Sequence, residues 1–257
     1  MIALEEGMKL EDVKHVGVVG GGIMGGGIAH ILSAAGYRVT IRDISDQIIE
    51  DTKESIVEGK WGVKRAVERG KMGFDTANQV IELVAYTTSI QDLAGCDVII
   101  EAVPEKLELK QEVFKELDET VKDEAIFTSN TSGLVIQEIA SPLPNARKEK
   151  FLGMHFSNPV PVMSMCEVIT TPESSQESVD TIVGLAKAGK RAVSLVKDTP
   201  GTYGFILNRV FAAAAREARK IVEDGIATPE DVDKAMITGR NWPAAFFGNR
   251  GGIGKEW

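Results

Sequence analysis

The feature that most constrains the fold is a glycine-rich run, HVGVVGGGIMGGGIAH, at residues 15–30. It begins with a short apolar segment that predicts a buried strand, and a segment with helical spacing follows the glycines. Gly20, Gly22 and Gly25 fit the pattern G-x-G-x-x-G. The first glycine of that pattern allows a tight turn, the second lets backbone approach a pyrophosphate, and the third lets the helix pack closely on the strand. The run therefore predicts a turn in which backbone, rather than side chains, holds a dinucleotide.

A second strand-like segment, RVTIRD, ends at Asp43, about 20 residues beyond the glycine turn. A carboxylate at this place accepts hydrogen bonds from a ribose diol and repels a 2′-phosphate, which favours NAD over NADP. Arg42 beside it can stack on adenine or meet a phosphate, so use of NADP is left open. Together with Ile23 and Met24 at the start of the helix, these residues predict an NAD site. The alternative is a structural glycine turn that binds nothing.

Strand-like and helical segments alternate through the first three quarters of the chain. The expected strands are 15–20, 38–42, 97–103, 125–129, 151–155, 165–170 and 191–196, and the expected helices are 23–35, 46–69, 105–121 and 175–188. This alternation predicts an α/β fold with a Rossmann-type, doubly wound, mostly parallel sheet. After KDTPG, helical spacing recurs at 206–222 and 229–237. We expect an NAD-binding domain over 1–199 and a short all-helical domain over 200–257.

Composition excludes several classes of function. The 257 residues carry a formal net charge of −9, which argues against a nucleic-acid partner. No apolar run reaches the roughly 18 residues that cross a bilayer, and the acidic N-terminal segment is unlike a secretory signal. Cys96 and Cys166 have neither metal-ligand spacing nor the pattern of a disulfide framework. We therefore expect a cytoplasmic protein with no metal and no membrane or nucleic-acid partner.

Oxidation of an alcohol by NAD needs a base for the hydroxyl proton, and the sequence has three histidines. His15 opens the first strand and His30 lies within the following helix, whereas His155 ends a strand, where open parallel sheets bind ligands. Glu167 lies in the apolar strand MCEVITT, which a short loop would place beside His155 as its partner. Two alternatives remain. His155 can be an ordinary loop histidine, and Cys166 can be a thiol nucleophile, although strand alternation turns it to the face opposite Glu167.

Two polar residues are candidates for holding the substrate oxygen. Ser132 follows a strand in TSNTSGL, and Asn208 lies off the apolar stripe of the first C-terminal helix. Either can instead be a cap or a surface group.

A basic cluster in this acidic chain comprises Lys60, Lys64, Arg65, Arg69 and Lys71. Lys60 and Lys64 are spaced as i, i+4 neighbours on the helix expected there. The cluster can bind a phosphorylated substrate handle, with Lys60 and Lys64 as contacts, or it can be a solvated helix face.

Several segments, in order along nearly the whole chain, resemble the 3-hydroxyacyl-CoA dehydrogenase family. They are VGVVGGGIMGGGIA, VIIEAVPEKLELKQEVF, SNTSGL, GMHFSNPVPVM, CEVITT, KDTPG, NRV and GRNWP. The resemblance implies that His155 is the catalytic base, that Glu167 is its partner, and that Ser132 and Asn208 contact the substrate oxygen.

The resemblance also implies positions for the cofactor and the thioester. Glu105, Lys110 and Asn158 would help to hold the nicotinamide half, and Asp43 would bind the ribose. The basic cluster would meet the CoA phosphate, and the C-terminal domain would form a homodimer interface.

The expected function is NAD-dependent oxidation of an L-3-hydroxyacyl-CoA to a 3-oxoacyl-CoA, or the reverse, as in fatty-acid β-oxidation. Two alternatives are kept: a dehydrogenase of a free hydroxy acid or sugar acid, and a non-catalytic NAD-binding protein.

Overall fold

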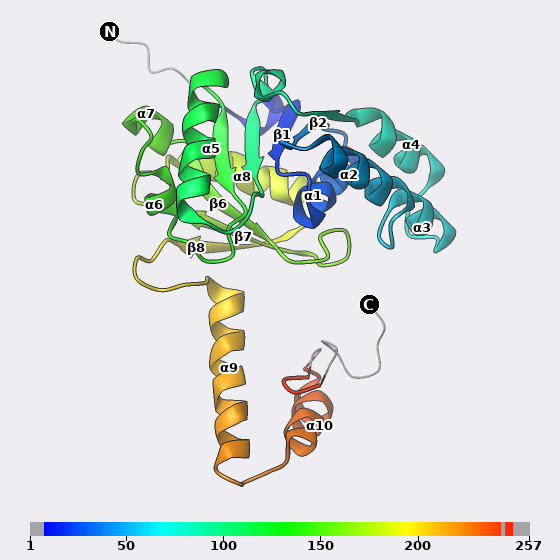
Figure 1. Cartoon of the computed structure of the whole chain (residues 1–257), viewed down its shortest axis with the longest axis vertical. Coiled ribbons are helices and arrows are strands. Elements are labelled where there is room, and N and C mark those ends of the chain that lie inside the picture. Colours follow the sequence, from blue (N-terminus) through cyan, green and yellow to red (C-terminus); the bar gives the residue numbers. More distant parts are fainter. Residues whose placement is uncertain (1–7, 243–244, 249–257) are drawn as a thin grey trace. The chain divides into compact units, whose positions relative to one another are not determined.

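The computed structural model describes residues 8–242 and 245–248. The chain divides into two compact units, Met1–Tyr203 and Gly204–Trp257 (Figure 1). Residues 1–7 of the acidic N-terminal segment and residues 249–257 of the expected C-terminal domain lie outside the described residues. No helix in the described part of the chain is long and apolar enough to cross a membrane.

The first unit is built on one sheet, in which eight strands of the described chain follow the order β3-β2-β1-β4-β5-β6-β7-β8. The strands are β1 (His15–Val19), β2 (Arg38–Arg42), β3 (Val84–Thr87), β4 (Val98–Glu101), β5 (Ile126–Ser129), β6 (Phe151–Phe156), β7 (Met165–Thr170) and β8 (Ala192–Lys197). Neighbouring strands pair in parallel except β6 with β7. Because the strand order reverses between β1 and β4, their carboxyl ends flank the crevice where such sheets bind ligands. The predicted fold class is confirmed.

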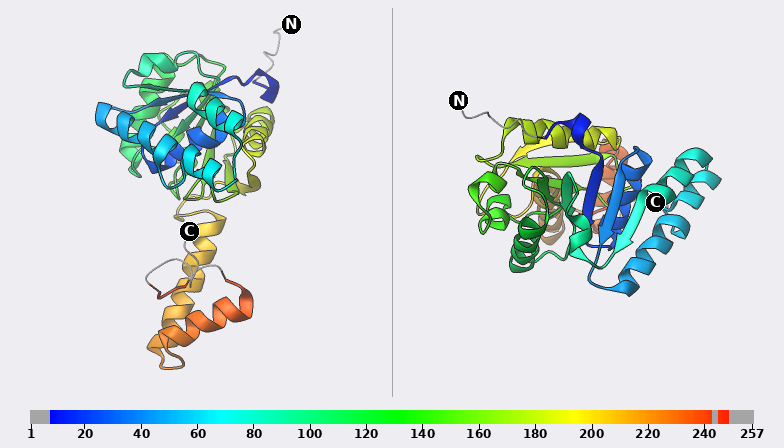
Figure 2. Two further views of the ribbon diagram at one scale, coloured as in Figure 1. Left: turned by 90° about the vertical axis from the view of Figure 1, so that its right-hand side faces the viewer. Right: turned by 90° about the horizontal axis from the view of Figure 1, so that it is seen from above.

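Helices cover both faces of this sheet (Figure 2). They are α1 (Ile23–Ala34), α2 (Asp46–Glu58), α3 (Val63–Glu68), α4 (Phe74–Leu83), α5 (Leu107–Thr120), α6 (Ile136–Ala140), α7 (Asn145–Lys148) and α8 (Gln176–Ala188), with 3-10 turns η1 (Leu10–Asp12) and η2 (Ile90–Leu93). On one face, Val18 of β1 shares a core with Ile28 of α1 and Ile182 of α8. On the other face, the ring of Phe114 in α5 lies 5.8 Å from that of Phe127 in β5. Burial on both faces explains why the central strands read as continuous apolar runs.

Several parts of this unit differ from the prediction. The helix expected over 46–69 is wrong, because the chain turns between α2 and α3, where the N–H of Gly62 donates to the carbonyl of Gly59. A Cβ at Gly62 would lie 2.8 Å from the Ile56 carbonyl oxygen, so this turn needs glycine. The prediction also lacked the helices α4, α6 and α7. It lacked β3 as well, an edge strand of four residues in which only Val84 is buried.

The second unit contains α9 (Ile206–Glu223) and α10 (Pro229–Arg240), which confirms helices in both segments where they were expected. The side chain of Thr228 caps α10 by accepting the N–H of Asp231, and Pro229 occupies the first turn. The carboxylate of Asp233, which is buried, accepts the N–H groups of Phe246 and Gly248 and so fastens the segment that follows the helix.

Candidate active site

The glycine turn joins β1 to α1, and each of its glycines meets a different constraint. Gly20 has φ +104°, and a Cβ there would lie 2.6 Å from the carbonyl oxygen of Ala102. A Cβ on Gly25 would overlap the carbonyl oxygen of Gly20, so the helix packs directly on the turn. Gly22 is exposed, and its Cβ would meet no atom within 4 Å. Folding therefore requires the first and third glycines, whereas the second leaves space for a ligand.

A cavity of about 760 Å³ lies against this turn. Gly20, Gly22, Ile23, Met24 and Asp43 all line it, as the sequence predicted for an NAD site. Its apolar wall includes the side chain of Ile23, which is 80% exposed. Because covering large apolar side chains lowers the free energy, this wall fits the adenine and ribose faces of a dinucleotide.

Of the charged residues that line the cavity, Arg42 and Asp43 lie at the end of β2, and Asp51 lies in α2. Asp43 accepts the N–H of Gly21 at 2.7 Å through Oδ2, which fixes the carboxylate against the turn. Thr52 of α2 also donates to the Gly21 carbonyl, so both sides of the turn are held by side chains from elsewhere. Arg42 lines the same cavity, and its Nε is buried without a hydrogen-bond partner. A fixed carboxylate beside the turn disfavours a 2′-phosphate, whereas Arg42 acts in the opposite sense.

His155 and Glu167 lie directly opposite each other on the antiparallel strands β6 and β7. His155 Nδ1 is 2.7 Å from Glu167 Oε2, and both side chains are buried, with 7% and 1% exposed. Residues opposite each other in a ladder project from the same face, so the strand register itself makes this pair. Cys166 belongs to the core on the other face, and burial raises the pKa of its thiol well above the usual range. A buried thiol of this kind is a poor nucleophile.

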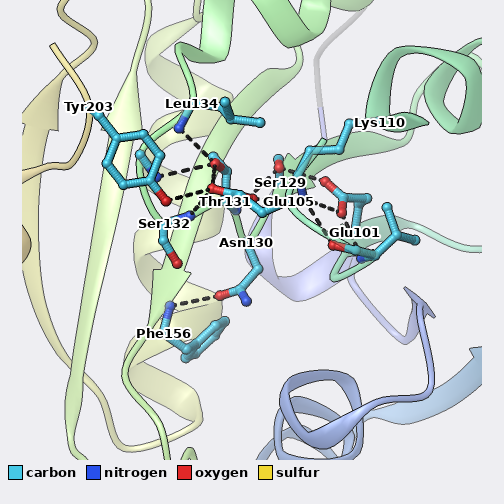
Figure 3. A network of polar contacts seen from close by, with 12 residues as sticks. Glu101, Glu105, Lys110, Ser129, Asn130, Thr131, Ser132, Leu134, Phe156 and Tyr203 are labelled. Atoms are coloured by element: carbon cyan, nitrogen blue, oxygen red, sulfur yellow. Dashed lines mark hydrogen bonds and ion pairs between the residues drawn. The ribbon is translucent and has the colours of Figure 1, made fainter. Parts of the chain in front are cut away.

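The loop after β5 carries Ser132 and is held from two sides (Figure 3). Glu105 Oε1 accepts the Thr131 hydroxyl at 2.6 Å and the Ser132 N–H at 2.9 Å. Asn130 Oδ1 accepts the N–H of Phe156, the residue after His155, at 2.9 Å. These contacts tie the Ser132 loop to the end of β6 and to the segment that leads into α5.

Lys110 of α5 lies between two carboxylates (Figure 3). Its Nζ is 2.6 Å from Glu101 Oε1 and 3.3 Å from Glu105 Oε2, and the side chain is only 1% exposed. Burial raises the pKa of Glu101, against the opposing effect of Lys110. At Glu105 burial acts in the same direction, but the hydrogen bond from Thr131 and the charge of Lys110 lower its pKa below the usual value. Direct contact of Lys110 with a nicotinamide stays a prediction.

The remaining predicted site residues belong to other elements of the fold. Asn158 is exposed in the loop between β6 and β7. Lys60 lies in the turn after α2 and Lys64 in α3, so the expectation that both occupy one helix is wrong. Lys64 pairs with Glu58. Asn208 lies in α9 of the second unit, and its role stays a prediction.

Two cations of the basic cluster lie near one aromatic ring. Lys60 Nζ is 5.0 Å and the Arg69 guanidinium carbon 5.6 Å from the ring centroid of Trp61. Both distances are in the range of cation–π contacts. The cluster therefore presents an aromatic surface together with positive charge.

Known proteins match both units of this chain. Residues 15–199 match the family described as "3-hydroxyacyl-CoA dehydrogenase, NAD binding domain", and residues 204–254 match its "C-terminal domain". This chain belongs to the 3-hydroxyacyl-CoA dehydrogenase family. The predicted family and the predicted cofactor, NAD, are confirmed, and binding of NAD in the cavity at the glycine turn stays a prediction.

Individual dehydrogenases agree with the family match. The human mitochondrial hydroxyacyl-coenzyme A dehydrogenase is 40% identical over 239 residues, which cover 91% of this chain and 74% of that protein. A 3-hydroxybutyryl-CoA dehydrogenase of Clostridioides difficile is 36% identical, over 88% of this chain and 78% of that one. The crystal structure of (S)-3-hydroxybutyryl-CoA dehydrogenase from Ralstonia eutropha matches with a TM-score of 0.85 and 32% identity, over 91% of this chain and 80% of that chain.

Sequence reasoning missed several residues that shape this dehydrogenase site. Glu101 is an acid at the end of an apolar strand, the same signal that marked Glu167, and it was not used. Asn130 and Thr131 carry no such signal, because small polar residues after a strand are common in turns of every kind. Thr52 was hidden for a similar reason, since nothing in its helix indicates contact with a turn 31 residues away.

Proposed function

We propose that this dehydrogenase interconverts L-3-hydroxyacyl-CoA and 3-oxoacyl-CoA, with His155 as the acid/base group. The proposal rests on the 2.7 Å contact between His155 and Glu167. This contact lies near the carboxyl end of β6, at the end of the sheet that also carries the Ser132 loop. NAD+, when bound, accepts the hydride that leaves C3 of the hydroxyacyl group.

The proton of the substrate hydroxyl goes to Nε2 of His155. An ionised carboxylate only accepts hydrogen bonds, so Glu167 fixes the ring proton on Nδ1 and leaves the lone pair on Nε2. When Nε2 takes the proton, the ring becomes an imidazolium, which the buried carboxylate stabilises. In the reverse reaction the same imidazolium returns the proton to the 3-oxo oxygen.

Binding groups complete the proposed site. Ser132 and Asn208 hydrogen-bond the reacting oxygen, and Lys60 and Lys64 attract the phosphates of the CoA. Asp43 makes NAD the preferred dinucleotide, despite Arg42. The exposure of Lys60, beside the ring of Trp61, supports a role in binding a phosphorylated nucleotide group.

The test measures NADH oxidation with acetoacetyl-CoA, in wild-type protein and in His155→Ala. We expect the variant to bind NADH with wild-type affinity and to lose nearly all turnover, since positioned acid–base catalysis contributes about 10²–10⁴ in rate. Turnover close to wild type in the variant would remove His155 from the mechanism.

Two further arms separate the alternatives. Free acetoacetate in place of acetoacetyl-CoA should give much slower turnover, and equal rates would favour a dehydrogenase of free hydroxy acids. NADPH in place of NADH should bind more weakly. NADH binding with no turnover of any 3-oxoacyl thioester would favour a non-catalytic binding protein.

We also propose that the protein acts as a homodimer in the cytoplasm, in fatty-acid β-oxidation. Support for the dimer comes from α9, where Ile206, Val210 and Phe211 are large apolar residues with at least 41% of their surface exposed. If a second copy of the chain covered these apolar side chains, the free energy of the dimer would be lower than that of two separate monomers. Sedimentation of the full chain tests this, and a monomer at micromolar concentration would contradict it.

A further inference from the structure

Glu101 is the most deeply buried acid of the site, with no exposed side-chain surface. Its Oε1 accepts Lys110 Nζ at 2.6 Å and the N–H of Val103 at 2.7 Å, and its Oε2 accepts the Ser129 hydroxyl at 2.6 Å (Figure 3). Three donors therefore satisfy this carboxylate. Because a buried charge without partners is very unfavourable, this arrangement keeps Glu101 and Lys110 together as a pair.

The Glu101–Lys110 pair determines how far Lys110 compensates the negative charge of Glu105. Lys110 is closer to Glu101 than to Glu105, at 2.6 Å against 3.3 Å. The Glu101–Lys110 pair is neutral as a whole, whichever member holds the proton. One cation between two carboxylates thus leaves a net charge of about −1 at this end of the site, and Glu105, one-third exposed, is the member that faces outward.

Glu105 also lies next to the dinucleotide cavity. Val103 and Pro104, directly before it, line that cavity, and Glu105 itself holds the Ser132 loop. In the proposed function this is the nicotinamide end. The nicotinamide ring carries a positive charge in NAD+ and none in NADH, so a carboxylate without a fully compensating cation favours the oxidised form.

We infer that Glu101 is a positioning residue that neutralises Lys110, so that Glu105 presents an uncompensated carboxylate and stabilises bound NAD+ relative to NADH. The inference rests on the proposed function, because it places the nicotinamide beside Glu105. Without the charge of Glu101, Lys110 would pair with Glu105 alone and the net charge of the group would fall to about zero.

The experiment compares the dissociation constants of NAD+ and NADH in three variants, with no acyl substrate present. NADH binding is followed by its fluorescence, and NAD+ binding by competition with NADH. Glu101→Gln keeps the shape and removes the charge. We expect it to raise the ratio of the NAD+ dissociation constant to the NADH dissociation constant about a hundredfold, because that is the effect of two unit charges about 5 to 6 Å apart near a protein surface. Glu101→Gln with Lys110→Met removes both charges and should return the ratio to within about threefold of wild type.

Asp97→Asn is the matched control. Asp97 directly precedes β4, at the opposite end of the strand from Glu101, and it too pairs with a lysine, Lys122, and accepts backbone N–H groups. This variant should lower thermal stability and leave the NAD+/NADH ratio unchanged.

Each outcome decides the inference. If Glu101→Gln weakens both dinucleotides equally, or neither, Glu101 does not set the charge at Glu105, and the inference is wrong. If Glu101→Gln does not fold, Glu105→Gln carries the test, because it removes the uncompensated carboxylate while its amide oxygen can still accept the Thr131 hydroxyl and the Ser132 N–H. It should raise the same ratio to a similar extent, and an unchanged ratio would contradict the inference. The binding ratio is measured without turnover, so failure of the proposed activity on acetoacetyl-CoA leaves this test intact.

Discussion

Glu167→Gln tests the acid/base pair most sharply, because the substitution keeps the size of the side chain and removes only its charge. Glu167 is 1% exposed and lies 2.7 Å from His155 Nδ1, so the imidazolium formed during oxidation has its countercharge roughly 4 Å from its centre. With an effective dielectric constant of about 20, two unit charges at that distance interact by about 4 kcal/mol. Losing this stabilisation in the transition state corresponds to about 10³ in rate.

The glutamine amide adds a second effect in the same direction. Its NH₂ group can donate to Nδ1, which moves the ring proton to Nε2, the atom that must accept the substrate proton. We therefore expect kcat for 3-hydroxybutyryl-CoA oxidation to fall by about 10²–10³, while the NADH dissociation constant stays within about twofold.

Cys166→Ala is the control from the same strand, since Cys166 neighbours Glu167 and faces the core instead. It should keep kcat within about threefold, which would also exclude a thiol nucleophile. The reasoning fails if Glu167→Gln keeps kcat within threefold of wild type, or if Cys166→Ala loses as much activity as Glu167→Gln.

Three further changes have distinct expected results. Gly22→Ala should fold with a melting temperature within about 2 °C of wild type and bind NADH at least tenfold more weakly, because its Cβ enters open space at the turn. Gly25→Ala, whose Cβ overlaps backbone, should instead lower stability, and equal behaviour of the two variants would contradict the assigned roles. Burial lowers the pKa of His30 from 6.5 to about 4, so the unfolded chain binds this proton first, and the free energy of unfolding falls by up to about 3 kcal/mol as the pH drops from 6.5 to 4. In urea unfolding, the free energy of His30→Gln should decline less steeply with falling pH than that of wild type, and a parallel decline would refute the burial effect. Lys60→Ala should raise the KM for acetoacetyl-CoA about threefold or more at low salt and less at high salt, whereas Lys64→Ala should change KM less, because Lys64 already pairs with Glu58. A KM that responds to neither substitution would mean that the basic cluster does not bind CoA.

The sequence was sufficient for those parts of the fold whose signals are local. The turn at Gly20 and Gly25 requires glycine for reasons of backbone contact, and the structure shows those contacts. The pairing of His155 with Glu167 followed from a strand end, a short loop and an acid in an apolar strand, and the strand register places the two residues opposite each other. The antiparallel direction of β7 follows from the same loop, which is too short for a crossover.

Signals that depend on distant contacts were missed. The helix expected over 46–69 breaks at Gly59–Gly62, where the chain turns between α2 and α3, and helical spacing alone does not show this turn. Helix α4 buries only Ala77 and Val80, while Phe74 is 75% exposed, so the helix has only a short apolar face for the sequence to show. The position of Lys110 Nζ between Glu101 and Glu105 was also missed, and its contact with the cofactor stays a prediction. Such an ion pair depends on the approach of α5 to the end of β4, which only coordinates reveal.

Transfer of label from the cofactor to the substrate shows whether hydride transfer at C3 and proton transfer at His155 occur together in this site. Wild-type protein is incubated with acetoacetyl-CoA and NADH deuterated at C4 on one face or the other, and the 3-hydroxybutyryl-CoA formed is examined by mass spectrometry. Deuterium at C3 from one face only, with almost none from His155→Ala at equal NADH occupancy, is the expected result. Unlabelled product, or equal label from His155→Ala, would mean that this site does not join hydride transfer at C3 to proton transfer at His155.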